Sequence, residues 1–377
     1  MAREIMLVVG EASGDAHGAR LVEALHRRDG TIKVFGVAGE QLQATRFEAL
    51  FSVARLTGMG LVELAGNLGN ILRAYRLLKQ ALKKRRPNLL VLIDFPEFNL
   101  RLARLAKSLR IPVLYYISPQ IWAWRQGRVK QIAKWVDHMA VVFPFEVDFY
   151  ARHQVKVSFV GHPLLETVRA RQDRGTVLRR LGLDPAKLTI GLLPGSRHGE
   201  VSKHLSIMRD AALLLRQQRG VQFFCVRANT IEASAIEALL QNSTLKIPIV
   251  DQERYEAINA ADLIWTASGT ATLEVALLGR PMIVVYRMSP LTYWLGRRLV
   301  QVEHVAMANL LAGERLVPEL LQDEVNPARL VSETIKLLDD HKLRLDISEK
   351  LSKLRERLGT PGAADRVADI ALSMMTA

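Results

Sequence analysis

Two glycine turns in the second half of the chain have the residue types of a phosphate site. The first turn holds Gly195, Ser196 and Arg197 and follows the apolar run 188–193. Glycine lets the backbone approach a phosphate closely, the helix expected next offers free N–H groups, and arginine can hold two phosphate oxygens at once. Because the Gly-Lys-Ser/Thr ending of a P-loop is missing, we predict a phosphate loop of another kind. An ordinary turn with a solvated arginine is the alternative.

The second turn follows the apolar run 263–266. It holds Ser268, Gly269 and Thr270, and Glu274 comes about one helical turn further on. Small hydroxylated residues can line a phosphate or a ribose, and a carboxylate at this place suits a bidentate hydrogen bond to ribose hydroxyls. Helix capping alone is the alternative. Two such turns in one half of the chain favour a nucleotide site.

Acidic residues in the first half are candidates for proton transfer. Asp94 and Glu97 follow the apolar run 89–93, and Asn99 comes two residues later. A carboxylate at the carboxyl end of a buried strand could take a proton from an attacking hydroxyl. A loop acid that caps the next helix is the alternative.

A tryptophan-rich segment follows the next expected strand. Trp122 and Trp124 stand between Gln120 and Arg125, and a basic helix comes after them. Aromatic rings beside a guanidinium suit a sugar, an acyl chain or a base. A helix anchored by buried tryptophan is the alternative.

Residues 61–86 predict a basic amphipathic helix. Such a helix can lie on anionic lipid, whereas a crossover helix packed on a sheet is the alternative for most of its apolar face. Residues 56–71 have more apolar and small residues than such packing requires, so this part is the predicted membrane or acyl-chain contact. The residues of that contact are Leu61, Leu64, Leu68 and Ile71.

Size and composition narrow the class of protein. The 377 residues, 49% of them apolar, suggest two packed domains, and Cys225 as the single cysteine excludes an internal disulfide. A net charge of +14 fits nucleic acid, an anionic membrane surface or an anionic substrate, or a generally basic proteome. No run approaches the roughly 20 apolar residues that span a membrane, and no signal peptide is visible. We therefore expect a cytoplasmic protein, soluble or peripheral on a membrane.

A metal site is not predicted. The sequence has no His-x-x-x-His pair. Glu146 with Asp148, and Asp251 with Glu253, are acidic pairs that suit the first turn of a helix better than a divalent ion. We expect neither a metal nor another cofactor.

Parallel sheets would position these residues. The expected strands are 5–9, 33–37, 89–93, 113–117, 138–143, 156–160, 188–193, 221–226, 247–250, 263–266 and 282–285. Near-continuous apolar strands with helical crossovers predict parallel sheets covered on both faces. Each half opens with a strand, a glycine turn and a helix start, which is typical of a doubly wound domain. The predicted fold class is α/β, with two Rossmann-like domains that face a cleft.

In their order, the motifs of the chain closely resemble those of lipid-A-disaccharide synthases. The matching stretches are Gly-Glu-Ala-Ser-Gly-Asp at 10–15, Gly-Val-Ala-Gly at 36–39, the loop 94–99, Tyr-Ile-Ser-Pro-Gln-Ile-Trp-Ala-Trp-Arg at 116–125, Phe-Pro-Phe-Glu at 143–146, Val-Gly-His-Pro at 160–163, Leu-Leu-Pro-Gly-Ser-Arg at 192–197, the turn 268–274, Tyr-Arg-Met at 286–288 and Asn-Leu-Leu-Ala-Gly at 309–313. The ordered set covers nearly the whole chain and is specific.

The resemblance implies a GT-B glycosyltransferase. Such an enzyme transfers 2,3-diacylglucosamine from UDP-diacylglucosamine to the 6-hydroxyl of diacylglucosamine 1-phosphate, forms a β-1,6 bond with inversion, and releases UDP without a required metal. It works as a peripheral protein at the anionic inner face of the inner membrane, and the family allows a homodimer with exchanged C-terminal segments. Residues 1–168 would form the acceptor domain, with helix 355–377 packing back on it, and residues 169–354 would bind the UDP-sugar.

The resemblance also assigns roles to single residues. Asp94 matches a carboxylate that the family needs for activity and is the preferred general base, whereas Glu11 and Asp15 are rival bases. Arg287 and Asn309 are expected in the donor site. The acceptor and acyl cleft is expected to contain Gly14, Glu97, Asn99, Gln120, Trp122, Trp124 and Arg125.

Two other classes of function stay open. One is a different GT-B UDP-N-acetylglucosamine transferase or a UDP-sugar 2-epimerase, which would act on a UDP-sugar without acyl chains. The other is a basic nucleic-acid-binding protein. Because the sequence has no recognisable nucleic-acid-binding motif, we expect no nucleic acid partner.

Overall fold

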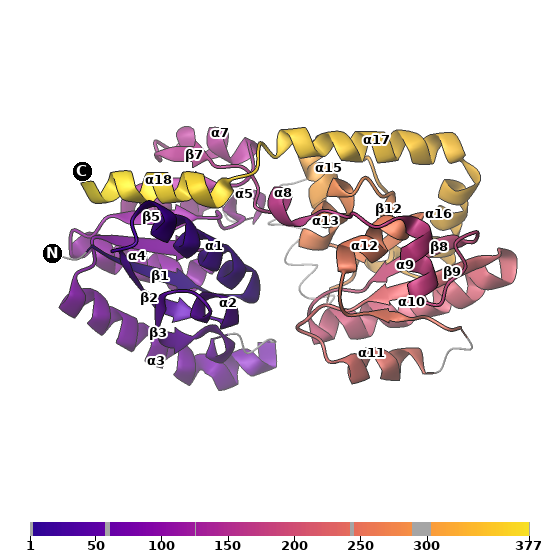
Figure 1. Ribbon diagram of the computed structural model, residues 1–377, viewed down its shortest axis with the longest axis horizontal. Coiled ribbons are helices and arrows are strands. Elements are labelled where there is room, and N and C mark those ends of the chain that lie inside the picture. The colour runs from indigo at the N-terminus through magenta and orange to yellow at the C-terminus, as the bar shows by residue number, and fades with distance from the viewer. Residues whose placement is uncertain (1–2, 57–60, 125, 242–244, 289–302, 377) are drawn as a thin grey trace. The chain divides into compact units, whose positions relative to one another are not determined.

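The computed structural model describes residues 3–56, 61–124, 126–241, 245–288 and 303–376. The chain forms two compact units (Figure 1). The first comprises Met1–Pro163 and Leu358–Ala377, and the second comprises Leu164–Arg357. Each unit has one parallel sheet built from strands of mostly buried apolar residues. The predicted α/β class with two parallel sheets is therefore confirmed.

The sheet of the first unit has seven strands in the order β3-β2-β1-β4-β5-β6-β7. This order places the start of the chain at the centre of the sheet, as in a doubly wound fold. The strands are β1 (Glu4–Val9), β2 (Lys33–Ala38), β3 (Phe47–Ser52), β4 (Leu89–Ile93), β5 (Val113–Tyr116), β6 (His138–Val141) and β7 (Val157–Phe159).

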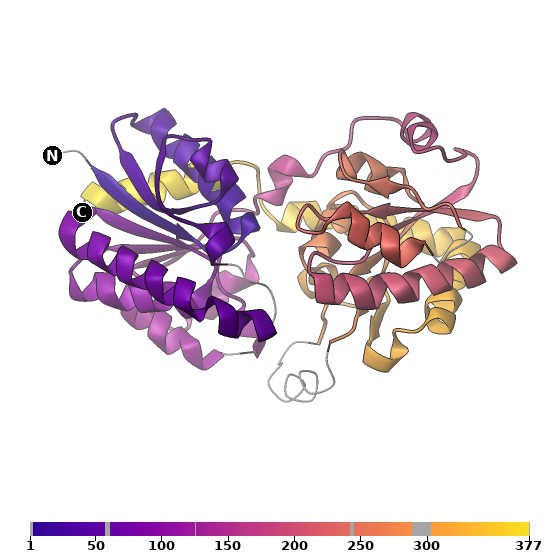
Figure 2. The ribbon, with the colours of Figure 1, turned by 90° about the horizontal axis from the view of Figure 1, so that it is seen from below.

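Helices cover both faces of the first sheet. The C-terminal helix α18 lies along α1 on one face (Figure 1), and ion pairs from Arg28 to Asp365 and Asp369 join the two helices. On the other face α3 and α4 run side by side (Figure 2). The helices are α1 (Ala12–Arg28), α2 (Glu40–Gln43), α3 (Leu61–Arg85), α4 (Pro96–Ser108), α5 (Ile121–Trp124), α6 (Val129–Trp135), α7 (Phe145–Ala151) and α18 (Ala363–Thr376).

The sheet of the second unit has six strands in the order β10-β9-β8-β11-β12-β13. They are β8 (Leu188–Leu193), β9 (Val221–Val226), β10 (Ile249–Val250), β11 (Leu263–Ala267), β12 (Met282–Tyr286) and β13 (Glu319–Leu321). The surrounding helices are α8 (Leu164–Thr167), α9 (Arg174–Arg180), α10 (His198–Gln218), α11 (Ala233–Leu240), α12 (Arg254–Ala260), α13 (Thr270–Leu277), α15 (Met307–Ala312), α16 (Pro327–Asp339) and α17 (His341–Arg357). Fully buried Trp265 donates its Nε1–H to Thr334 Oγ1 at 2.9 Å and so ties the sheet to α16.

The apolar runs predict strands well where a strand is buried on both faces. All eleven expected strands are present, and β4 consists of five fully buried residues. The sequence prediction misses β3 and β13, which lie at the edges of the two sheets. β3 is largely solvent-accessible and carries exposed Glu48, and β13 has only three residues. Neither has the continuous apolar run of a central strand.

Helix α3 is the amphipathic helix expected over 61–86. Its second half packs as a crossover helix, because Ala74, Leu78 and Leu82 are fully buried. Tyr75 meets Phe98 of α4 edge-on, with ring centroids 6.1 Å apart. The crossover alternative therefore holds for this half of the helix.

The predicted membrane contact lies at the other end of α3. The side chains of Leu61, Leu64 and Leu68 are outside the described residues, and Ile71 is partly exposed. In the part of the chain that the structure describes, no helix is long and apolar enough to cross a membrane.

Candidate functional site

The turn after β4 holds Asp94 in a fixed conformation. Asp94 and Phe95 have left-handed backbones, with φ of 48° and 51°, a conformation that costs about 1–3 kcal/mol for such residues. The Asp94 carbonyl oxygen accepts hydrogen bonds from the Tyr115 hydroxyl at 2.5 Å and from Asn99 Nδ2 at 2.7 Å. A Cβ at Gly10 would lie 2.2 Å from Phe95 Cγ. Glycine at position 10 and these two hydrogen bonds thus keep the turn in place.

The surroundings of Asp94 make its carboxyl group more basic. Burial raises the pKa of Asp94 to about 6, because it disfavours the charged form, and the negative charge of Glu11 adds to the effect. The two carboxylates come together because β1 and β4 are neighbouring parallel strands that pair Val9 with Ile93. A carboxylate with this pKa is mostly deprotonated at neutral pH and can still accept a proton.

Asp15, predicted as a rival base, has a structural task. Its carboxylate accepts hydrogen bonds from the backbone N–H groups of Gly39 at 2.7 Å, Gln41 at 2.9 Å and Leu42 at 3.3 Å. It therefore caps the start of α2 and joins that helix to α1. A Cβ at Gly39 would lie 2.6 Å from the Asp15 carboxyl carbon, which explains the glycine. Glu11, in contrast, is exposed and makes no capping hydrogen bond.

Trp122 is anchored rather than free. It is 9% exposed and donates its Nε1–H to Glu146 Oε1 at 3.1 Å. The other oxygen of Glu146 accepts from the backbone N–H groups of Phe143 and Val142 at 3.1 and 3.3 Å. Burial raises the pKa of Glu146 to about 7 in spite of these donors. Glu146 thus fixes the tryptophan segment to the turn after β6, which supports the buried-tryptophan alternative for Trp122.

Two further residues expected at the acceptor cleft lie at the start of α4. Asn99 is fully buried and donates to the carbonyl oxygens of Ile93 and Asp94 at 3.2 and 2.7 Å, so it shapes the Asp94 turn from behind. Glu97 is exposed and pairs with Arg128 at 2.5 Å. Asn99 therefore positions the Asp94 turn, whereas Glu97 lies at the surface.

The remaining residues expected at the acceptor cleft are one helix glycine and three residues of the tryptophan-rich segment. Gly14 lies in α1, where an added Cβ would stand 3.5 Å from the Val9 Cβ, so its small size allows close packing on β1. Gln120 is exposed just before α5. The side chain of Trp124 and all of Arg125 lie outside the described residues.

In the second unit, the predicted phosphate turn follows β8 and is open to solvent at Arg197. Gly195 has a φ of 125°, and an added Cβ would stand 3.0 Å from Glu200 Oε2. The Ser196 carbonyl oxygen accepts a hydrogen bond from the Thr230 hydroxyl at 2.6 Å. Arg197 precedes α10, has a side chain 60% exposed, and is paired with Glu200 at 3.1 Å. The helix N-terminus at the start of α10 and the exposed charge of Arg197 suit a phosphate.

The turn after β11 emerges beside it, because β8 and β11 are neighbouring parallel strands. Gly269 has a φ of 139°, and exposed Thr270 begins α13. Ser268 donates its hydroxyl to the Val305 carbonyl oxygen at 3.0 Å. The two turns that the sequence pairs as a nucleotide site are thus at one edge of one sheet.

His204 of α10 links the first of these turns to the end of β12. Its Nδ1 lies 3.0 Å from the Pro194 carbonyl oxygen, and its Nε2 lies 3.1 Å from the backbone N–H of Arg287. A carbonyl needs a donor and an N–H needs an acceptor, so the ring is neutral with its hydrogen on Nδ1. Burial lowers the pKa of His204, which agrees with this state. Arg287, a predicted donor-site residue, is itself exposed.

Glu274, predicted to hold a ribose, is occupied within its own unit. It is 5% exposed, accepts the Tyr255 hydroxyl at 3.0 Å, and pairs with Arg254. Burial is the main cause of its raised pKa. Arg254 and Tyr255 lie at the start of α12, so each oxygen of Glu274 already has one partner within the second unit.

Asn309, the other expected donor-site residue, is fully buried. Its amide group donates to the Val317 carbonyl oxygen at 2.9 Å and to Glu319 Oε1 at 2.8 Å, and its Oδ1 accepts from Val317 N–H at 3.0 Å. Glu319 also accepts the backbone N–H groups of Val305 and Ala306, each at 3.0 Å. Asn309 therefore positions the start of α15 and the segment beside Ser268.

Comparison with known proteins agrees with the ordered motifs. Residues 5–371 match the profile of a family described as lipid-A-disaccharide synthetase. A lipid-A-disaccharide synthase from Geobacter metallireducens is 44% identical over 374 residues, which cover 99% of this chain and 97% of that relative. The chain belongs to the lipid-A-disaccharide synthase family.

Solved structures show that this family member has a GT-B type fold, as predicted. UDP-GlcNAc 2-epimerase from Neisseria meningitidis, bound to UDP-GlcNAc, matches with a TM-score of 0.67 at 13% identity and covers 98% of this chain and 100% of its own. A calicheamicin glycosyltransferase matches with a TM-score of 0.63 at 15% identity and covers 100% and 99%. Likeness at this level of identity concerns the fold alone.

Sequence reasoning alone missed two residues that position the site of this lipid-A-disaccharide synthase family member. Glu146 belongs to the Phe-Pro-Phe-Glu motif, but its pattern indicated only a helix start. His204 sits on an otherwise ordinary amphipathic helix, and no spacing signals its two backbone partners. Among the described residues, no group of three or more His, Cys, Asp or Glu side chains is placed to hold a metal ion.

Proposed function

We propose that the chain transfers diacylglucosamine from its UDP donor to the 6-hydroxyl of diacylglucosamine 1-phosphate. The product is a β-1,6-linked disaccharide 1-phosphate, and UDP leaves. The observation that carries the proposal is the family match over residues 5–371 together with 44% identity to a curated synthase along nearly the full chain. The first unit takes the acceptor, and the second unit takes the UDP-sugar.

Asp94 is the proposed general base. An inverting transfer needs a group that accepts the proton of the attacking 6-hydroxyl as the new C–O bond forms. Asp94 is held rigidly at the end of β4, and burial with the Glu11 charge raises its pKa to about 6. Exposed Glu11 is the remaining rival, since the Asp15 carboxylate is bound to three backbone N–H groups.

The two turns of the second unit hold the diphosphate in this proposal. As the sugar–oxygen bond breaks, negative charge grows on the departing UDP and must be stabilised. Arg197 is exposed beside the N-terminus of α10 and can turn from Glu200 to the phosphates, while the start of α13 adds a second set of backbone N–H groups. Gly195, Ser196, Ser268, Gly269 and Thr270 line the turns, and Glu274 and Arg287 are the proposed partners of the nucleoside sugar and phosphate.

The proposed place of action is an anionic membrane surface. Leu72 and Leu77 of α3 are 42% and 37% exposed, and several basic side chains of the same helix are exposed beside them. These are Arg73, Arg76, Lys79, Lys83 and Lys84. Each basic residue close to anionic lipid contributes about 1 kcal/mol, so this surface supports peripheral binding next to lipid substrates.

Donor selectivity tests the proposal. UDP release is measured with diacylglucosamine 1-phosphate as acceptor and with either UDP-diacylglucosamine or UDP-N-acetylglucosamine as donor. We expect UDP release with the acylated donor only. Turnover of only the non-acylated sugar, or its conversion without an acceptor, would instead assign the chain to the transferase or epimerase alternative.

A further inference from the structure

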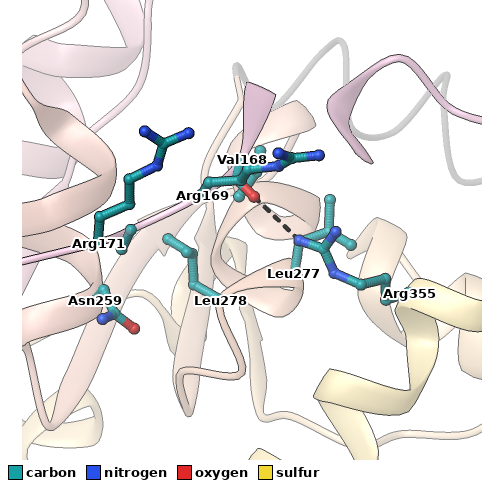
Figure 3. A pocket seen from close by; sticks show the side chains of 8 residues that line it. Val168, Arg169, Arg171, Asn259, Leu277, Leu278 and Arg355 are labelled. Carbon is teal, nitrogen blue, oxygen red and sulfur yellow. Dashed lines mark hydrogen bonds between the residues drawn. The ribbon is translucent and has the colours of Figure 1, made fainter. Parts of the chain in front are cut away.

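A second group of cationic side chains lines a pocket in the second unit, away from the two glycine turns. The pocket has a volume of about 370 Å³ (Figure 3), within the range of small-molecule sites. Its lining comes from the segment between α8 and α9 and from α12, α13 and α17. The lining residues are Val168, Arg169, Ala170, Arg171, Asn259, Leu277, Leu278 and Arg355.

The lining carries three positive charges and no negative one. In the described part of the chain, Arg169, Arg171 and Arg355 form no ion pair with an acidic residue. Nearby arginines are paired: Arg174 lies 2.8 Å from Asp262, for example. Like charges around one cavity repel each other, and an anion bound among them would relieve the repulsion that water and salt do not screen.

The polar groups that face the pocket are donors. Arg355 is oriented by hydrogen bonds to the carbonyl oxygens of Leu165 at 3.5 Å and Val168 at 3.0 Å. The Asn259 oxygen accepts from Arg280 at 3.0 and 3.3 Å, which leaves its NH₂ group to donate. Three guanidinium groups and one amide NH₂ therefore offer hydrogen bonds to an acceptor.

Other charges near the pocket do not cancel this excess. Glu256 is directed at the backbone, where it accepts the N–H groups of Arg171 and Gln172 at 2.9 to 3.1 Å. α13 ends at Leu277, and its dipole places roughly half a negative charge there. The last carbonyl oxygen of α12, on Ala260, accepts from Arg174. The three positive charges of the arginines still exceed the one negative charge of Glu256 together with these partial charges.

We propose that this pocket binds a phosphate group, held by Arg169, Arg171 and Arg355. The planar guanidinium matches two phosphate oxygens at once. Val168, Leu277 and Leu278 provide an apolar lining beside the charges (Figure 3). The phosphate comes from either a soluble molecule or a phospholipid headgroup.

The pocket is separate from the proposed donor site. α13 runs from Thr270, at the proposed UDP turns, to Leu277, at the pocket, and eight helical residues span about 12 Å. The pocket also adjoins both places where the chain passes from one unit to the other, after residues 163 and 357. Arg355, just before the second crossing, donates hydrogen bonds to Leu165 and Val168, which follow the first crossing.

Binding measurements on the full chain test the site. Calorimetric titration with inorganic phosphate uses the parent chain and the double variant Arg169→Ala/Arg171→Ala, with saturating UDP present to occupy the donor turns. The variant alters exposed side chains and leaves Arg355 in place, and Arg216→Ala removes a comparable exposed charge from α10 as the control. Co-sedimentation with phosphatidylglycerol/phosphatidylcholine vesicles is the second probe.

The double variant is expected to weaken at least one of the two binding reactions by about tenfold or more, since each lost charged hydrogen bond is worth about 1.5–3 kcal/mol. The control should stay within about twofold of the parent, as a lone exposed charge contributes little. Loss with phosphate alone identifies a soluble source, and loss with the anionic vesicles identifies a headgroup. If neither probe binds the double variant more weakly than it binds the control, the phosphate site does not exist.

Discussion

The turn after β4 and the turn after β8 start alike and are built differently. Each follows a mostly apolar strand at the carboxyl edge of a parallel sheet. The first turn is held by the Tyr115 hydroxyl and the Asn99 amide around the partly buried carboxyl group of Asp94. The second turn exposes the side chain of Arg197, which forms an ion pair with its near neighbour Glu200. Burial thus raises the pKa of Asp94, whereas the exposed side chain of Arg197 is the one that we propose to contact the diphosphate.

The largest effect is expected at the buried turn. Asp94→Asn keeps the shape of the side chain and removes the base, so kcat should fall roughly 10²–10⁴-fold. UDP affinity, measured by calorimetry, should stay the same because the two turns of the second unit are untouched. Asp148→Asn, which alters an exposed carboxylate of the same unit, is the control and should keep normal kcat. Near-normal turnover of Asp94→Asn would move the base to Glu11.

Asp94→Asn, which should lower kcat, is expected to raise the stability of the fold. Burial raises the folded-state pKa of Asp94 above its ordinary value. The group therefore favours the fold at low pH, and that stability is lost as pH rises through about 6. Because Asn carries no charge, Asp94→Asn should melt at a higher temperature than the parent at pH 7.5. A lower melting temperature there, by calorimetry, would contradict the burial argument.

A smaller effect is expected at the exposed turn. Arg197→Ala should weaken UDP binding roughly 10- to 100-fold, because charged hydrogen bonds are worth about 1.5–3 kcal/mol. Arg197→Lys should recover part of the affinity, since it keeps the charge and loses the two-pronged contact. The melting temperature of both variants should stay near the parent value. Unchanged UDP affinity in Arg197→Ala would remove this residue from the donor site.

Substitutions of His204 test whether the turn after β8 depends on the hydrogen bonds of this buried imidazole. His204→Leu leaves the Pro194 carbonyl and the Arg287 N–H without partners, and UDP affinity should fall about fivefold. His204→Gln offers both a donor and an acceptor and should fall less. If both variants bind UDP as the parent does, the two turns are positioned without the imidazole.

The smallest effect is expected in the dependence of kcat/KM on pH, which reports the pKa of Asp94. With Asp94 as base, kcat/KM should rise as pH increases through about 6 and then level off, because the deprotonated form is active. Glu11→Gln removes the nearby negative charge and should move this inflection to lower pH. A profile that Glu11→Gln does not move would show that burial alone sets the pKa.

The sequence predicts central strands and strand-end turns because these depend on neighbouring residues. β4 is a continuous apolar run and β8 is apolar apart from Thr189, and the turns with Asp94 and Arg197 follow these strands directly. The partners of Asp15, Glu146, Glu274 and His204 could not be predicted in this way. Asp15 meets Gly39 and His204 meets Arg287 only because the sheet brings distant segments together. The backbone N–H donors that make Asp15 a cap, and the burial that raises the pKa of Asp94, are equally properties of the folded chain.

The transfer of an acylated sugar is the central claim, and a mass-spectrometric assay tests it most directly. The purified chain is incubated with UDP-diacylglucosamine and diacylglucosamine 1-phosphate, and the lipid products are analysed beside a reaction with Asp94→Asn. We predict a disaccharide 1-phosphate with the acyl chains of both substrates, formed in equal amount to UDP and almost absent with the variant. If the parent chain leaves both lipids unjoined, the account is contradicted.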